Sequence, residues 1–181
     1  MRDISTLRLR FFAKIEEGSE GLDLGAGDGR WVTTAANIRT RVTAIDRQPA
    51  PAGPLPIGSS WIQADLHDGL AAILKDGQKF DFMMCFNAIQ FMPRDYILGE
   101  FLPSLAHYAR PDCVLGLCTF WKDPNPAFEH PFTSLYTALE LVEALKGWEI
   151  LQAEQRESDA LSLDGVTLRH WYATEILAHF P

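Results

Sequence analysis

Apolar residues in this chain form short runs and helically spaced groups separated by turn residues, a pattern typical of alternating strands and helices. The runs predict strands near residues 22–24, 41–45, 60–64, 80–86, 114–120, 148–153 and 167–177. Helical spacing predicts helices near residues 6–17, 31–38, 70–74, 93–108 and 134–145. The run at 80–86 is apolar almost throughout, which is typical of a central strand covered on both faces. The pattern therefore favours an α/β fold.

Turn and cap residues predict where several of these elements begin and end. We expect Asp28 to cap the helix that follows it, and Ser134 to open the helix that ends at Gly147. Pro103 should kink the helix in which it lies. Asp164–Gly165 predicts a turn between the last two strands, which no helical pattern separates.

The connection between the second and third predicted strands lacks a helical pattern. Residues 47–58 contain four prolines and two glycines, a composition that is incompatible with a regular helix. We therefore expect a proline-rich loop at 47–59 in place of a crossover helix, either as a surface linker or as a loop that folds across a ligand. Residues 1–19 predict only a short helical segment, and 181 residues suit one domain, 1–181.

The segment 20–30, Glu-Gly-Leu-Asp-Leu-Gly-Ala-Gly-Asp-Gly-Arg, ends a predicted strand in a turn with three glycines. Gly25, Gly27 and Gly29 let a ligand approach the backbone, and a strand–turn–helix unit usually presents free backbone N–H groups there. The next strand ends at Asp46, nineteen residues after Gly27, where a carboxylate can accept both hydroxyls of a ribose. Together these features predict a nucleoside-binding site.

The spacing of the glycines indicates the kind of nucleoside. A dinucleotide-binding turn has the pattern G-x-G-x-x-G, and its third glycine would fall at Arg30 in this chain. The chain has G-x-G-x-G instead. The alternatives left open are a tight turn without a ligand and a nicotinamide or flavin site.

Charge and composition exclude several classes of protein. A formal net charge of −8, with no basic run, argues against nucleic acid as a partner or substrate. The N-terminus is charged where a signal peptide would be apolar, and no stretch reaches the roughly 18 apolar residues of a membrane span. We therefore expect a cytoplasmic protein without membrane contact. The three cysteines lack C-x-x-C spacing, which predicts buried reduced thiols, with neither a disulfide framework nor a metal site.

The octapeptide 22–29, Leu-Asp-Leu-Gly-Ala-Gly-Asp-Gly, closely resembles the first motif of class I methyltransferases that use S-adenosylmethionine. The resemblance implies a Rossmann-like, doubly wound, mostly parallel seven-stranded sheet with an antiparallel C-terminal strand, in a three-layer αβα arrangement. It also implies that Asp65 and the backbone of Leu66 contact the adenine, and that Phe86, Asn87 and Ala88 flank the sulfonium and the methyl group that it carries. The full set of implied cofactor contacts is Asp23, Gly25, Ala26, Gly27, Asp46, Arg47, Asp65, Leu66, Phe86 and Asn87.

Fewer residues can be predicted for the site that binds the methyl acceptor. The loop 121–132 is rich in prolines and aromatic residues at the place where substrate contacts are expected, so Trp121 and His130 are the predicted acceptor contacts. The final third of the chain most resembles the tellurite-resistance type of methyltransferase, which implies a small, soft nucleophile as acceptor. If the acceptor must first lose a proton, the candidate bases are His67, His130 and His170. No residue is assigned as catalytic.

These observations predict an S-adenosylmethionine-dependent methyltransferase that transfers a methyl group in line to a small-molecule acceptor and forms S-adenosylhomocysteine. Because the cofactor carries its own leaving group, the protein must mainly position the acceptor behind the methyl group and exclude water. A monomer or homodimer is expected. The alternatives are a non-catalytic module that binds the adenosyl cofactor for a partner protein, and a nicotinamide-dependent oxidoreductase.

Overall fold

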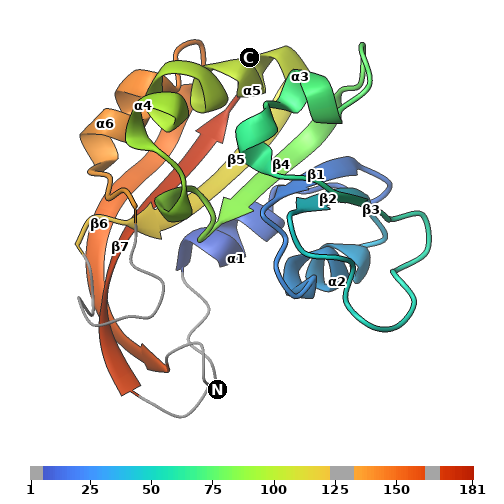
Figure 1. The fold of residues 1–181 in the computed structure, drawn as a ribbon, viewed down its shortest axis with the longest axis horizontal. Coiled ribbons are helices and arrows are strands. Elements are labelled where there is room, and N and C mark those ends of the chain that lie inside the picture. The colour runs from blue at the N-terminus through green and yellow to red at the C-terminus, as the bar shows by residue number, and fades with distance from the viewer. Residues whose placement is uncertain (1–5, 123–132, 162–167) are drawn as a thin grey trace.

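The computed structural model describes residues 6–122, 133–161 and 168–181. These residues form one seven-stranded sheet (Figure 1), with the strands β1 (Glu20–Leu24), β2 (Arg41–Asp46), β3 (Ser60–Gln63), β4 (Phe80–Phe86), β5 (Ala109–Phe120), β6 (Glu149–Leu161) and β7 (Leu168–His179). The strand order is β3-β2-β1-β4-β5-β7-β6, and all pairings are parallel except those of β7 with β5 and β6. The predicted mostly parallel sheet with an antiparallel C-terminal strand is confirmed.

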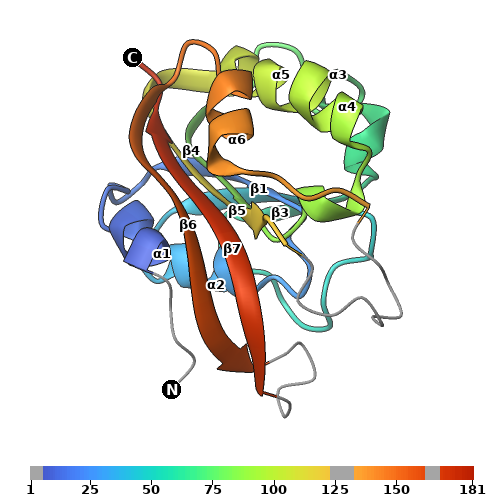
Figure 2. The same ribbon diagram turned by 90° about the vertical axis from the view of Figure 1, so that its left-hand side faces the viewer.

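Helices cover both faces of the sheet, which gives three layers (Figures 1 and 2). One face carries α1 (Thr6–Phe12) and α2 (Arg30–Ala36), and the other carries α3 (Leu70–Ile73), α4 (Arg94–Tyr96), α5 (Leu102–Tyr108) and α6 (Ala138–Ala144). The remaining helical turns are η1 (Leu66–Asp68), η2 (Ile89–Phe91) and the π-helical η3 (Ile97–Phe101). Phe82 and Met84 of β4 pack under α1 and α2, whereas Met83 and Cys85 join the opposite core. This double burial explains the apolar sequence of β4.

Pro103 lies in a helical stretch whose hydrogen bonding changes next to it. α4, η3 and α5 follow one another directly, and the π-helical turn η3 ends two residues before Pro103. Proline lacks an N–H, and its ring crowds the carbonyl group four residues earlier, so a wider turn relieves both problems. The predicted disturbance at Pro103 therefore takes the form of a π turn.

The predicted cap of α2 is wrong by one position. Gly29, and not Asp28, is the N-cap residue. The Asp28 carboxylate nevertheless binds the helix start, because its Oδ1 accepts the backbone N–H of Arg30, the first residue of α2, at 3.2 Å. The same carboxylate pairs with the Arg30 side chain, with Oδ1 2.8 Å from Nε and Oδ2 2.6 Å from Nη2.

The predicted start of α6 is also wrong. The helix begins at Ala138, because Thr137 and Glu140 form a capping box there. Ser134 is buried and donates its hydroxyl to the carbonyl of Met92 at 2.8 Å. A reciprocal cap with two hydrogen bonds therefore fixes the helix start, and the earlier serine has another role.

The connection between β2 and β3 contains no helix, as the proline-rich sequence 47–59 predicts. The loop folds back on the sheet edge, where Trp61 Nε1 donates to the carbonyl of Gln48 at 3.1 Å. Pro51 packs beside Gly29, since its Cγ would lie 3.2 Å from a β-carbon at that position. A loop and a tryptophan ring therefore cover this face of β2 and β3.

The hairpin of β6 and β7 extends past the end of β5 (Figure 2). β5 and β7 are paired as far as Phe120 and Ala173, whereas β6 and β7 stay paired as far as Leu161 and Leu168. Both strands are longer than predicted, because backbone pairing continues through polar residues that an apolar pattern does not mark. The predicted Asp164–Gly165 turn lies outside the described residues.

Candidate functional site

The turn after β1 lies against the segments that follow β3 and β4. Gly25 has a φ of 78°, and a β-carbon at this position would lie 2.3 Å from Cβ of Ala88 and 3.9 Å from Cδ1 of Leu66. The left-handed backbone and the contact with Ala88 both require glycine. Gly25 therefore lets three strand ends converge, as the doubly wound fold predicts for a binding site.

The backbone N–H groups of this turn are hydrogen-bonded within the protein. Gly25 and Ala26 donate to the carbonyl of Ile45 at 2.9 and 3.1 Å, and Gly27 donates to Oδ2 of Asp46 at 2.7 Å. The prediction of free N–H groups is therefore wrong for these three residues, because the turn is bound to the end of β2. A pyrophosphate needs such donors, so the arrangement argues against the dinucleotide alternative.

Asp23 is a buried acid with an unpartnered oxygen. Its exposed fraction is 1%, and Oδ2 has no hydrogen-bond partner among the described residues. Burial, and then repulsion from Asp46 and Asp28, raises the pKa of Asp23 to about 8. Such a group is unfavourable in its ionised form until a cation or hydrogen-bond donor joins it. Asp23 is therefore suited to a ligand group that brings a positive charge or a hydrogen-bond donor to its free oxygen.

Asp46 is held in place by two backbone groups. Oδ2 accepts the N–H of Gly27 at 2.7 Å, and Oδ1 accepts that of Gln48 at 2.8 Å. Each carboxylate oxygen keeps a further lone pair, so Asp46 can still accept hydrogen bonds from two hydroxyl groups. Arg47 is exposed, and its carbonyl accepts from Nε2 of Gln63 at 3.2 Å.

Asp65 and Leu66 follow β3 on the same side of the sheet. Asp65 caps η1, and its Oδ1 accepts the N–H of His67 at 2.9 Å. Leu66 is buried, and its carbonyl accepts the hydroxyl of Tyr96 at 2.6 Å. The two predicted adenine contacts thus lie on a turn that hydrogen bonds fix beside Gly25.

β4 ends with a buried aromatic residue followed by an exposed polar one. Phe86 packs against Phe11 and Trp31, with ring centroids 5.6 and 5.4 Å apart. Asn87 is exposed, has a φ of 61°, which is uncommon outside glycine, and donates its N–H to the carbonyl of Cys118 at 2.8 Å. Asn87 therefore presents polar atoms at this strand end, and Phe86 supports it from the core.

Arg8 of α1 brings a positive charge to the same end of the sheet. Its guanidinium carbon lies 4.9 Å from the ring centroid of Trp31 and 5.2 Å from that of Phe86, and Nη2 donates to Sγ of Cys118 at 3.7 Å. The sequence pattern marked only the apolar face of this helix. No spacing signal identifies Arg8, because its position depends on how α1 packs against the sheet.

Residues 1–155 match the protein family described as "Methyltransferase domain". The chain belongs to this methyltransferase family. The match confirms the predicted class I methyltransferase, and with it an enzyme whose cofactor is S-adenosylmethionine. A comparison with curated protein sequences found no match.

Several solved structures share the fold of the methyltransferase. TehB from Haemophilus influenzae is 18% identical with a TM-score of 0.72, and the match covers 93% of this chain but only 60% of TehB. The 1,6-didemethyltoxoflavin-N1-methyltransferase of Burkholderia thailandensis, solved with 1,6-didemethyltoxoflavin and S-adenosylhomocysteine, is 17% identical with a TM-score of 0.66, covering 94% of this chain and 76% of that one. The N-methyltransferase NodS of Bradyrhizobium japonicum is 13% identical with a TM-score of 0.67, covering 96% and 92%. At these identities the likeness shows the fold.

Trp121 of the methyltransferase lies beyond the strand end that carries Asn87. It follows Cys118 by three residues, which corresponds to about 10 Å along an extended chain. Its ring lies 5.3 Å from that of Tyr172, over which Nζ of Lys122 lies at 4.4 Å. The indole Nε1 of Trp121 is buried and has no hydrogen-bond partner among the described residues. A buried indole N–H normally has a partner, so this donor is suited to a ligand.

The predicted candidate bases of the methyltransferase lie in separate places. Nε2 of His170 lies 3.0 Å from Oε2 of Glu157 on the extended hairpin. The ring of His67 packs against Tyr96 at 4.9 Å, next to the turn after β3. His130 lies outside the described residues. In the described part of the chain, no hydrogen bond or ring contact joins a histidine to Asn87.

The cysteines of the methyltransferase are free and buried, as predicted. Burial raises the pKa of all three thiols, to about 12 for Cys113 and about 11 for Cys118, so they stay protonated. The described residues contain no group of three or more His, Cys, Asp or Glu side chains arranged to hold a metal ion. In the same residues, no helix has the length and apolar character needed to cross a membrane.

Proposed function

We propose that this methyltransferase transfers a methyl group in line from S-adenosylmethionine to a small-molecule acceptor. The observation that carries the proposal is Asp23, a buried carboxylate whose Oδ2 lacks a partner in the described structure and which is repelled by two further acids. S-adenosylmethionine supplies a methyl group on a positively charged sulfur, and it also carries an ammonium group and two ribose hydroxyls. A cationic ligand with hydroxyl donors fits this acidic site, whereas an anionic dinucleotide does not.

The residues around the turn suit different parts of the cofactor. Asp23 would bind the ammonium group, and Arg8 would offer its positive charge to the carboxylate of the same amino-acid end. Asp46 would accept the ribose hydroxyls through the lone pairs that Gly27 and Gln48 leave unused. The predicted contacts that remain are Ala26 and Gly25 in the turn, Arg47 beside the ribose, Asp65 and Leu66 at the adenine, and Phe86 and Asn87 at the methyl group.

The protein's own contribution to the reaction is placement. The turn, Asp46 and the backbone of Asn87 are fixed by hydrogen bonds to backbone groups, so this part of the site is organised before an acceptor arrives. Holding two reactants in line can supply roughly 7–11 kcal/mol of the barrier reduction, which makes a dedicated catalytic side chain unnecessary when the acceptor is already a nucleophile.

The acceptor is proposed to be small and to contact Trp121 and His130. The unpartnered indole N–H of Trp121 supports a polar contact there. The Burkholderia thailandensis structure holds 1,6-didemethyltoxoflavin, and the coclaurine N-methyltransferase structure holds N-methylheliamine, both small molecules. The net charge of −8 supports an acceptor other than nucleic acid. A cytoplasmic monomer or homodimer stays our prediction.

Calorimetry followed by a transfer assay tests this function. The protein is first titrated with S-adenosylhomocysteine and with NADH, and methyl transfer to a panel of thiols, amines and nitrogen heterocycles is then followed by mass spectrometry. Binding of S-adenosylhomocysteine with transfer to a panel member is the expected result. Binding without transfer to any of them favours the non-catalytic module, and tight binding of NADH alone overturns the proposal.

Asp46→Ala is expected to weaken the binding of S-adenosylhomocysteine by about 1–3 kcal/mol, because the ribose hydroxyls lose their acceptor. Asp28→Ala is the matched control, since Asp28 is exposed and pairs with Arg30 on the outside of the turn. Calorimetric dissociation constants check both variants. Equal affinities in the two would contradict the assignment of Asp46.

Trp121→Phe is expected to raise the KM for the acceptor about tenfold, because the variant keeps an aromatic ring and loses one hydrogen-bond donor. The affinity for S-adenosylhomocysteine should not change. Trp148→Phe makes the same chemical change in the core beside Phe180 and serves as the control. Steady-state kinetics with an acceptor from the panel provide the measurement, and an unchanged KM would remove Trp121 from the acceptor site.

A further inference from the structure

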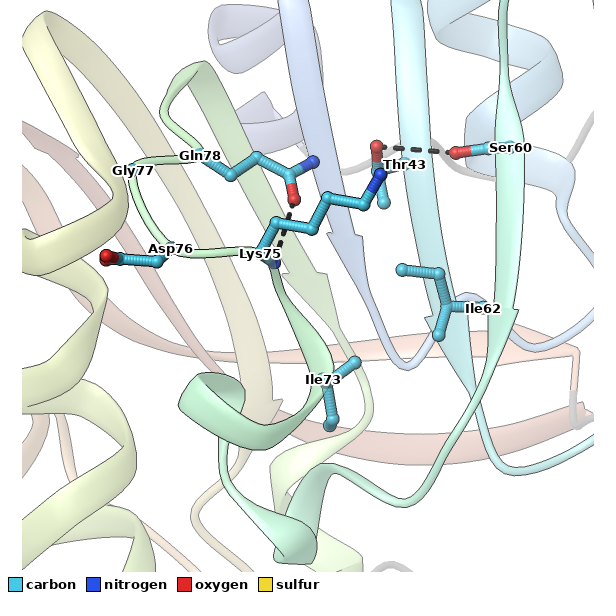
Figure 3. Close-up of a pocket in the computed structure, with 8 residues that line it drawn as sticks. All are labelled: Thr43, Ser60, Ile62, Ile73, Lys75, Asp76, Gly77 and Gln78. Carbon is cyan, nitrogen blue, oxygen red and sulfur yellow. Dashed lines mark hydrogen bonds between the residues drawn. The ribbon is translucent and has the colours of Figure 1, made fainter.

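A cavity of about 540 Å³ lies at the edge of the sheet, on the face that carries α3 (Figure 3). β2 and β3 form one wall, and the connection from α3 to β4 forms the other; the lining residues are Thr43, Ser60, Ile62, Ile73, Lys75, Asp76, Gly77 and Gln78. Ser60 begins β3, and Gln78 comes two residues before β4 begins. The cavity thus lies toward the amino ends of these strands, whereas Asp46 and Asp65 lie at the carboxyl ends.

The cavity exists because α3 is short. α3 has four residues, and its C-cap, Leu74, is already extended. The chain then turns back through residues 75–79 to reach β4, so no helix covers the inner half of β2 and β3 on this face. The exposed sheet surface becomes the floor of a site whose volume is within the usual range for small ligands, roughly 300–1,000 Å³.

The polar side chains of this cavity are mainly hydrogen-bond donors. Lys75 and Gln78 point across the cavity toward β2 and β3, whereas Asp76 points away from it (Figure 3). Oε1 of Gln78 accepts the backbone N–H of Lys75 at 3.4 Å, so its amide NH₂ is available as a donor. The hydroxyl of Ser60 donates to that of Thr43 at 3.4 Å, and the Thr43 proton is then available as well.

Lys75 and Asp76 are the charged residues that line this cavity, and their side chains point in different directions (Figure 3). Arg30, Arg39 and Arg41 each have an acidic partner within 3.0 Å. Lys75, in contrast, forms no ion pair with any residue of the described ranges 6–122, 133–161 and 168–181. Ile62 and Ile73 add apolar surface next to this ammonium group.

We propose that this cavity is a second binding site, for a small organic anion. A carboxylate or phosphate head would be bound by Lys75, Gln78 and the Thr43 hydroxyl, and an apolar body would pack on Ile62 and Ile73. Charge-assisted hydrogen bonds to an ammonium group are about twice as strong as neutral ones, so the anionic head is required. The site is separate from the proposed cofactor site and does not depend on it.

Nuclear magnetic resonance of the ¹⁵N-labelled full chain tests the site, with benzoate, phenyl phosphate and the neutral analogue benzamide as probes. Benzoate or phenyl phosphate is expected to shift amide signals of Thr43, of residues 60–62 and of residues 73–78; the stronger of the two identifies the head group. Benzamide should bind about tenfold more weakly or not at all, because it lacks the charge.

Lys75→Met and Asp76→Asn are the matched variants for this titration. Both positions are exposed, so the fold is expected to tolerate either change. Lys75→Met should lower the affinity for benzoate and phenyl phosphate about tenfold or more, and Asp76→Asn should not weaken it. Equal binding of benzamide, full affinity in Lys75→Met, or shifts confined to the glycine turn would overturn the proposal.

Discussion

Asp23→Asn is expected to bind S-adenosylhomocysteine at least about tenfold more weakly than the wild type, because a charge-assisted hydrogen bond to a buried carboxylate is lost. The same change should stabilise the free protein at alkaline pH. The wild type must keep Asp23 buried among other acids, and burial raises its pKa from 3.8 to about 8. An amide has no charge to bury, so affinity and stability should change in opposite directions.

The raised pKa of Asp23 determines how the stability difference between the two proteins changes with pH. Between pH 3.8 and about 8, folded Asp23 holds a proton that the unfolded chain releases. The wild type therefore loses stability relative to Asp23→Asn as the pH rises through this window, and the difference is constant above it. Urea unfolding of both proteins at pH 5, 7 and 9 measures the effect. A difference that does not change with pH would show that Asp23 is already ionised in the free protein.

Proton release on ligand binding offers an independent check. The ammonium group of S-adenosylhomocysteine favours the ionised form of Asp23, so binding at pH 7 should release protons in the wild type and fewer in Asp23→Asn. Calorimetry in buffers with different ionisation enthalpies counts these protons. Equal proton release by the two proteins would place the ammonium group away from Asp23.

Gly25→Ala is expected to cause the largest loss of stability of the substitutions considered, about 2–5 kcal/mol, from the left-handed backbone and the overpacking together. A β-carbon here would lie 2.3 Å from Cβ of Ala88 at a φ of 78°. Gly27→Ala is the matched control, because Gly27 also has a positive φ, 57°, but has open space around it. This variant should lose only about 1–2 kcal/mol.

The double variant Gly25→Ala with Ala88→Gly separates the steric contact between positions 25 and 88 from the backbone strain at position 25. Removing the side chain at position 88 leaves only the backbone strain, so the double variant should recover much of the stability and of the affinity for S-adenosylhomocysteine. Urea unfolding and thermal shifts with ligand provide the measurements. The predicted approach of the two segments would be contradicted if Ala88→Gly rescued neither property.

The strands and the family were predictable because they depend on local sequence signals. The apolar run of β4 and the glycine turn after β1 mark central positions of the fold by periodicity and spacing. Helix starts were less predictable: Ser134 and Thr137 are equivalent as single residues, and only the carboxylate of Glu140 decides between them.

The cofactor contacts stay a prediction, and the structure differs from the expectation in the hydrogen bonding of the glycine turn. The motif identifies Gly25 to Gly27 as the turn, but their N–H groups are used by Ile45 and Asp46, which only the register of β1 against β2 determines. Arg8 likewise reaches Phe86 through the packing of a helix that is distant in sequence. The cavity beside Lys75 depends on the length of α3. The apolar periodicity overestimates this length only slightly, but the difference decides how much of the β2 and β3 surface the helix covers.

The thin covering of β2 and β3 affects how readily this edge of the sheet opens locally. On one face β2 packs against α2 while β3 meets the proline-rich loop, and on the other face both strands are covered by a helix of a single turn, whereas the centre of the sheet is packed more fully from both sides. Amide protons at this edge should therefore exchange with solvent well before those of β4 and β5. Asp46 and Asp65 stand at the end of these same strands. An adenosyl ligand would thus hold this thinly covered edge in place, and part of its binding free energy would be used to keep the edge from opening.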